Sequence, residues 1–346
     1  MKKLLVGVLV LALAGVLGMS LATAQDKPME KVMIGTSPAL SSAGIFIAIE
    51  KGYLAEEGID ADATTFHRSG GELLPSLIKG DLDVGAGNVS AGIYNAFNDG
   101  HGLQIVADKG RVAKDHGYLA LMSANKHVPD GDISKFKLQK GFKVSTTGPG
   151  VSQEVVYAKW AKHYGIDIED LEIVNLPLPG VGAALGTDQI DASIMIEPFI
   201  ANSIEQDLAV KIAGDEEIYP DQQSAVILFS PKFVAERPAV AQKVAKAYVR
   251  ALRDYNDAFE YGVGKEEIIK ILMKYTSVKD RAAYDKIVPA FLHPDGAMNL
   301  ESLAEDVQFF RDRGYIKKPV DVSKVVNTTW IENAVKELGP YQPPKK

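Results

Sequence analysis

The sequence has no cysteine among its 346 residues. This absence excludes disulfide bonds, thiolate metal sites and a cysteine nucleophile. It also leaves no residue to which a lipid anchor could be attached, which favours a freely soluble exported protein over a lipid-tethered one. An excess of basic residues is missing as well. The formal net charge is -7, and an acidic chain without a basic stripe is a poor candidate for nucleic-acid binding.

Common catalytic and metal-binding patterns are equally absent. The 6 histidines are scattered along the chain without paired spacing or a suitably placed carboxylate, so we predict no metal site. The sequence contains neither a Gly-x-Ser-x-Gly nucleophile elbow nor a phosphate-binding Gly-Lys-Ser/Thr loop. We therefore expect a protein that has no cofactor and is not an enzyme.

The N-terminus has the three regions of a secretory signal. Lys2 and Lys3 precede an apolar run over residues 4–21, and the small residues 22–24 follow it. We predict that residues 1–24 are a signal peptide and that the mature protein is periplasmic. The apolar run is close to the minimum length that spans a membrane, so a retained membrane anchor is the alternative. Nothing later in the sequence resembles a membrane span.

The rest of the chain contains an internal repeat. Residues 32–85 and residues 143–192 each have the pattern of a strand, a polar loop, a helix, a strand, a glycine-containing loop, a helix and a strand. Two copies are too few for a solenoid, so the repeat predicts two α/β lobes that face each other across a cleft. Strands that alternate with helices predict doubly wound, mainly parallel sheets. With 46% hydrophobic residues, the chain can bury two modest cores.

The order of these patterns also predicts the domain organisation. Lobe 1 is expected to comprise residues 30–123 and 225–346, and lobe 2 residues 124–224. A chain that leaves one lobe, builds the other and returns must cross twice, which predicts a two-segment hinge. In the C-terminal part we expect helices over residues 239–261, 266–275, 281–292 and 300–313.

A parallel α/β sheet binds ligands beyond the carboxyl ends of its strands. The loops expected there are rich in hydroxyl and glycine residues, whose N–H groups suit an anion or a carbonyl. Ordinary helix capping is the alternative interpretation of any single loop, but here the loops recur in both copies. The predicted ligand-binding residues are Ser37, Ser41, Ser42, Arg68, Ser69, Gly70 and Asn88 in lobe 1, and Thr146, Thr147, Gly148 and Glu197 in lobe 2.

The charge of the ligand is left open by the sequence. Arg68, Lys109 and Arg111 follow predicted strands of lobe 1 and favour an anion, whereas Glu197 favours a nitrogen heterocycle. Aromatic residues commonly line small-molecule sites. The candidates here are Phe46, Phe66, Tyr94 and Phe199.

Four segments resemble a known family. Residues 48–60 (AIEKGYLAEEGID), 77–85 (LIKGDLDVG), 191–199 (DASIMIEPF) and 309–316 (FFRDRGYI) are similar to the solute-binding proteins of ABC importers, in the family that groups nitrate, sulfonate and taurine binders with binders of thiamine-pyrimidine precursors. The resemblance implies a two-lobed, type II-like periplasmic-binding-protein fold. It also implies a small-molecule ligand closed between the lobes and an ABC permease of the inner membrane as partner. We expect a monomer.

Together these observations predict a carrier for a small polar organic solute. The solute would be a sulfonate- or carboxylate-type anion, or a nitrogen heterocycle such as a pyrimidine or vitamin precursor. One alternative is an enzyme of the dehydratase or cyclase type on the same fold, although such enzymes generally lack an export signal. Another alternative is a ligand-sensing subunit of a membrane receptor.

Overall fold

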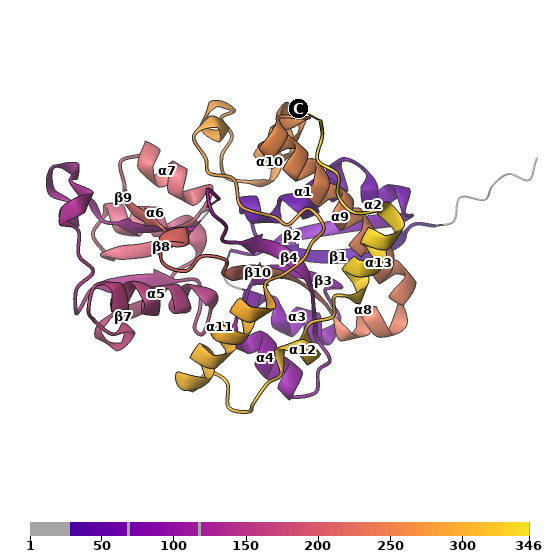
Figure 1. Ribbon diagram of the computed structural model, residues 1–346, viewed down its shortest axis with the longest axis horizontal. Helices are drawn as coiled ribbons and strands as arrows, with labels where there is room; N and C mark the ends of the chain where they lie inside the picture. Colours follow the sequence, from indigo (N-terminus) through magenta and orange to yellow (C-terminus); the bar gives the residue numbers. More distant parts are fainter. Residues whose placement is uncertain (1–27, 68–69, 117–118, 346) are drawn as a thin grey trace, which may run out of the picture.

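The computed structural model describes residues 28–67, 70–116 and 119–345, and these form two α/β lobes (Figure 1). Each lobe contains one five-stranded sheet. The strands of the first sheet are, in spatial order, β2 (Ile59–Thr65), β1 (Glu30–Thr36), β3 (Val84–Asn88), β10 (Gln223–Phe229) and β4 (Gln104–Arg111). Those of the second are β7 (Glu172–Asn175), β6 (Lys143–Thr146), β8 (Ala192–Ile196), β5 (Leu119–Ser123) and β9 (Val210–Gly214).

The two sheets have the same topology, which confirms the repeat. Strands β1, β2 and β3 occupy the positions that β6, β7 and β8 occupy in the other sheet. In each sheet one strand, β10 or β5, is antiparallel to both of its neighbours, while the other neighbouring pairs are parallel. Both antiparallel strands are those by which the chain enters a sheet after crossing from the other lobe. The remaining strands end at the boundary between the lobes, as predicted for mainly parallel sheets.

The structure corrects one expected boundary. Strand β5 pairs with β8 and β9, so the second lobe includes residues 119–123, which were expected in the first lobe. All five residues of β5 are buried. A short buried apolar strand fits the centre of either sheet, and its partners lie far along the sequence, so the local pattern could not assign it.

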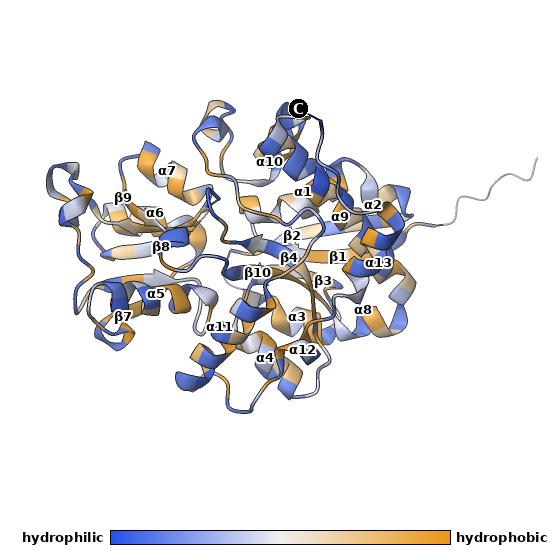
Figure 2. Cartoon of the chain, viewed as in Figure 1, coloured by the Kyte–Doolittle hydropathy of each residue, from blue (hydrophilic) through white to orange (hydrophobic). Residues whose placement is uncertain are grey.

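Helices cover both sheets. Lobe 1 has α1 (Ala43–Glu50), α2 (Tyr53–Glu56), α3 (Leu74–Lys79) and α4 (Ala91–Asn98), and lobe 2 has α5 (Ser152–His163), α6 (Leu178–Gly186) and α7 (Phe199–Glu205). The C-terminal part adds α8 (Pro231–Glu236), α9 (Pro238–Tyr261), α10 (Lys265–Tyr275), α11 (Leu300–Asp312), α12 (Val322–Val325) and α13 (Thr329–Leu338). Figure 2 shows hydrophobic residues on β1 and β3, and hydrophilic and hydrophobic residues alternating along the helices. None of the described helices is long and apolar enough to cross a membrane.

Most of the helices expected in the C-terminal part form, and helix α9 shows why. Helix α9 begins with Pro238, whose missing N–H lies in the first turn, and ends before Gly262, which has a φ of 75°. Its apolar face packs against α1 and α13. The expected helix over 281–292 is wrong. It forms only the 3-10 turn Ala282–Asp285, because Pro289 cannot continue a helix and Phe291 instead bridges to Arg111.

Candidate functional site

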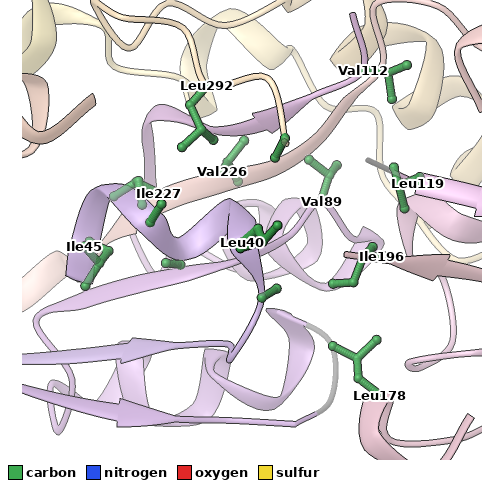
Figure 3. Packing of buried hydrophobic residues seen from close by; sticks show 14 of the residues in the cluster. Leu40, Ile45, Val89, Val112, Leu119, Leu178, Ile196, Val226, Ile227 and Leu292 are labelled. Atoms are coloured by element: carbon green, nitrogen blue, oxygen red, sulfur yellow. The ribbon is translucent and has the colours of Figure 1, made fainter. Parts of the chain in front are cut away.

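The two lobes touch through the loops at the carboxyl ends of their strands. Among the described residues, backbone hydrogen bonds cross the boundary from Leu40 N to Glu197 O (3.3 Å), from Leu178 N to His67 O (3.0 Å), from Ala91 N to Gly150 O (2.8 Å) and from Ser152 N to Val89 O (2.9 Å). Figure 3 shows the apolar side chains of Leu40, Val89, Leu178 and Ile196 in this region. The loops that the repeat nominated therefore face one another across the two lobes.

A cavity of about 410 Å³ lies between the lobes. Lobe 1 contributes Gly71, Glu72, Ser90 and Gly92, and lobe 2 contributes Thr147, Gly148, Pro149 and Asn175. Ser90 is 2% exposed. Among the described residues, its hydroxyl has no hydrogen-bond partner. Ser90 also immediately precedes α4. The positive end of this helix dipole favours negative charge, while Ala91 N already donates to Gly150 O and Ile93 N to Ser90 O. This wall of the cavity suits an anionic or hydrogen-bonding ligand.

The opposite wall is held in place by buried side-chain hydrogen bonds. Thr147 donates to Gln153 Oε1 from both its backbone N (3.0 Å) and its Oγ1 (2.9 Å), and Gln153 Nε2 donates to Ile194 O at 2.8 Å. Thr146 Oγ1 lies 3.0 Å from both Gly148 O and Asn175 Oδ1. The hydroxyls of Thr146 and Thr147 thus fix the loop after β6, and this loop presents Gly148 and Pro149 to the cavity.

The predicted serines of lobe 1 gather around Lys109. Its Nζ donates to Ser41 Oγ at 2.8 Å and lies 3.4 Å from Ser37 Oγ. Thr36 Oγ1 donates to Ser42 Oγ at 2.9 Å, and Ser42 Oγ is 3.2 Å from Ser37 Oγ. Lys109 lies within β4, not after a strand as expected, and is 1% exposed. Burial lowers the pKa of its ammonium group to about 7.

Glu197 lies apart from the cavity that contains Ser90. It lines a different cavity of about 440 Å³ together with Lys211 and Lys286. Its Oε2 accepts a hydrogen bond from Ala201 N at 3.1 Å, at the start of α7. The side chain is buried, and this burial raises the pKa of its carboxyl to about 7. Its position gives Glu197 a contact with the first turn of α7.

The other predicted site residues are distributed unevenly. Thr147 and Gly148 line the cavity between the lobes, whereas Asn88, the last residue of β3, is half-buried and pairs with Ala225. Arg68 and Ser69 lie outside the described residues, and Gly70 begins the 3-10 turn Gly70–Glu72.

Sequence reasoning missed some of the cavity-lining residues. Ser90 belonged to a nominated loop, but Asn88 was chosen from that loop instead. Asn175 was missed, although its place at the end of β7 was a usable signal.

Two of the candidate aromatic walls and one candidate cation have other contacts. Phe46 and Tyr94 are fully buried in lobe 1, and Phe46 stacks on Tyr275 with ring centroids 4.4 Å apart. The guanidinium of Arg111 lies over the Phe291 ring, 4.9 Å from its centroid. The side chains of Phe46 and Arg111 thus pack against the C-terminal part.

Two similar α/β lobes with a cavity between them define the periplasmic-binding-protein fold. Residues 25–269 match the model of the NMT1-like family, and the chain belongs to this family. The nitrate/nitrite binding protein NrtA of Nostoc sp. is 23% identical over 354 residues, covering 92% of this chain and 79% of that protein. A Bacillus subtilis protein named for binding aliphatic sulfonates is 26% identical over 353 residues and 97% of both chains.

A solved structure supports the same fold. The periplasmic nitrate-binding protein NrtA from Synechocystis PCC 6803 superposes with a TM-score of 0.71 at 16% identity, covering 90% of this chain and 89% of that one. The resemblance drawn from the four sequence segments and the predicted fold class are confirmed. These relatives are named as binding proteins, in agreement with the expectation that the chain is not an enzyme.

Proposed function

We propose that the protein captures a small organic or inorganic oxyanion between its two lobes in the periplasm and delivers it to an ABC permease. The observation that carries the proposal is the cavity of about 410 Å³ whose walls come from both lobes. Its volume lies within the range of roughly 300–1,000 Å³ that is usual for small-molecule sites. The names of the relatives, which refer to nitrate, nitrite and aliphatic sulfonates, support the same ligand class.

The electrostatics of lobe 1 favour an anion over a neutral heterocycle. The unpartnered Ser90 hydroxyl offers a donor at the start of α4, where the helix dipole favours negative charge. A second basic group, the buried amine of Lys109, donates to Ser41 of the neighbouring loop. A nitrogen heterocycle remains the competing ligand class, because the acidic residue Glu72 also lines the cavity.

Binding acts through the arrangement of the lobes. A ligand held by both walls stabilises the arrangement in which the lobes touch, by the difference between its affinities for the closed and the open states. It also stabilises the folded protein by mass action, by about 2.7 kcal/mol when its concentration is a hundred times the dissociation constant. The ligand leaves chemically unchanged.

The decisive experiment is native mass spectrometry of the protein purified from the periplasm, followed by calorimetric titration of the ligand-free form with nitrate, methanesulfonate and a neutral pyrimidine. We expect an anion to bind and the Ser90→Ala variant to bind it about tenfold more weakly, since a hydrogen bond to a charged group contributes about 1.5–3 kcal/mol. The control is Ser203→Ala, because the Ser203 hydroxyl is also buried but donates to Phe199 O within α7.

Three results would contradict the proposal. Binding of the pyrimidine alone would move the ligand to the heterocycle class. Equal affinities of the Ser90→Ala and wild-type proteins would remove the cavity from the binding site. Conversion of the solute in proportion to protein and time would favour an enzyme on this fold.

A further inference from the structure

Lys109 is a buried basic group without an ion-pair partner among the described residues. Its side chain is 1% exposed, and in the part of the chain that the structure describes its Nζ contacts the hydroxyls of Ser41 (2.8 Å) and Ser37 (3.4 Å) but forms no ion pair. Burial of a charge that has no opposite charge beside it is costly. Such a group calls for a functional explanation.

The neighbouring carboxylate of Asp108 acts on Lys109 through its charge but does not form an ion pair with it. Asp108 precedes it in β4, at a place where the register of β4 against β10 shifts. The Asp108 carboxylate accepts hydrogen bonds from His293 N (2.7 Å), Gln223 Nε2 (2.6 Å) and Gly110 N (2.9 Å). Asp108 therefore fastens the C-terminal part to β4 and β10, and the hydrogen bonds of its carboxylate go to groups other than the Lys109 ammonium.

The Lys109 ammonium group sets the direction of a chain of hydroxyls. A lysine ammonium only donates hydrogen bonds, so Ser41 and Ser37 accept from it, and their own protons must point away from it. Ser41 and Ser42 are buried, whereas Ser37 is half-buried. Lys109 therefore also orients the hydroxyl of Ser37, the half-buried serine of this loop, so that its proton points away from the ammonium group. This loop lies against lobe 2, since Leu40 N donates to Glu197 O at 3.3 Å.

We propose that Lys109 is a positioning residue that makes the loop Ser37–Ser42 an oxyanion subsite, in which a sulfonate- or carboxylate-type group accepts from the Ser37 hydroxyl and supplies the missing negative charge. This inference deepens the proposed function and rests on it. It assigns selectivity for charge to a side chain that does not itself touch the solute. A neutral molecule of the same shape gains nothing from Lys109.

The test compares two probes of nearly equal shape, the anion methanesulfonate and the neutral dimethyl sulfone. Wild-type protein should bind methanesulfonate more tightly. Lys109→Met removes the charge but keeps the length of the side chain, and it should raise the dissociation constant for methanesulfonate about ten- to a hundredfold while leaving that for dimethyl sulfone within about twofold. The matched control is Lys143→Met, because Lys143 is the first residue of β6, at the end of the strand opposite the loops between the lobes.

A second measurement separates positioning from a structural role. Unfolding of the ligand-free proteins should show that Lys109→Met is at least as stable as wild type, since the variant replaces an uncompensated buried charge by an apolar group. Ser41→Ala should weaken methanesulfonate binding in the wild-type background and have a smaller effect in the Lys109→Met background.

The possible failures are distinguishable. If Lys109→Met keeps the wild-type preference for methanesulfonate, or if its ligand-free stability falls together with its affinity, the subsite is wrong while the carrier function stands. The same conclusion follows if wild-type protein binds both probes equally well. If wild-type protein binds neither probe, the proposed oxyanion ligand fails together with the subsite.

Discussion

Gly150 offers the sharpest test of the contact between the lobes. It lies in the loop of lobe 2 between β6 and α5, with a φ of 64°. Its backbone O accepts from Ala91 N at 2.8 Å, and its backbone N donates to Glu154 Oε1 at 2.7 Å. A methyl group added at Gly150 would lie 3.2 Å from both Ala91 Cβ and Tyr315 Cγ, which is closer than ordinary van der Waals contact. Gly150→Ala therefore strains the backbone and also presses the first lobe and the C-terminal segment away from the second.

Gly165 separates these two effects. It follows α5 in the same lobe and has a similar φ of 74°, but a methyl group there would have no neighbour within 4 Å. Gly165→Ala should lower the free energy of unfolding by about 1–2 kcal/mol, the usual cost of a left-handed conformation with a side chain. Gly150→Ala should have the same backbone cost and an additional packing cost of about 1–3 kcal/mol.

The packing cost of Gly150→Ala should reduce the affinity for the ligand, because the added methyl group destabilises the closed arrangement in which the lobes touch. We expect Gly150→Ala to raise the dissociation constant by about fivefold or more, and Gly165→Ala to leave it unchanged. Urea unfolding of the ligand-free proteins and calorimetric titration with the solute measure the two quantities. Wild-type affinity in Gly150→Ala, together with the same loss of stability as in Gly165→Ala, would refute the argument that this contact forms part of the ligand-bound state.

Two further predictions concern pH and export. Burial raises the pKa of Asp306 from 3.8 to about 8, so its contribution to stability is complete below about pH 4 and is lost as the pH rises through 8. Urea unfolding at pH 5 and pH 8 should show a smaller decline for Asp306→Asn than for wild type, and equal declines would contradict the assignment. For export, the intact mass of the protein released by osmotic shock should correspond to a chain that begins near Gln25. A membrane-bound species that retains residues 1–24 would favour the anchor instead.

The fold was predictable because the repeat constrains it. Each copy alternates strands and helices, and the same strand order in both sheets follows from that shared pattern. The predictions were wrong where pairing with residues distant in the sequence determines the secondary structure or the lobe of a segment. Strand β5 is apolar throughout, so only its pairing with β8 and β9 shows that it belongs to lobe 2. The expected helix over 281–292 is interrupted because Phe291 pairs with Arg111 of β4 instead.

The loops that form the boundary between the lobes were also predictable, but the choice of residues within them was not. The loop after β3 was nominated, yet Ser90 and not Asn88 lines the cavity, because Asn88 still belongs to the strand and pairs with Ala225 of β10. That strand lies far along the chain, and nothing in the local pattern shows where pairing stops. Glu197 was chosen as a strand-end carboxylate, but its Oε2 accepts from Ala201 N in the following helix.

Lys109 shows the limit most clearly. A lysine near the end of a strand is usually placed in solvent, and the sequence alone could only group it with other cations beyond the strands. Its burial depends on which face of β4 is covered, and the loop that covers it comes from residues 37–42, which precede Lys109 by 67 or more positions. Asp108 and Lys109 are neighbours at a shift in the register of β4 against β10. The Asp108 carboxylate is satisfied by hydrogen bonds, whereas the Lys109 side chain has no ion-pair partner among the described residues. The proposed charge selectivity depends on a contact between β4 and a distant hydroxyl-rich loop, and only the folded chain reveals this contact.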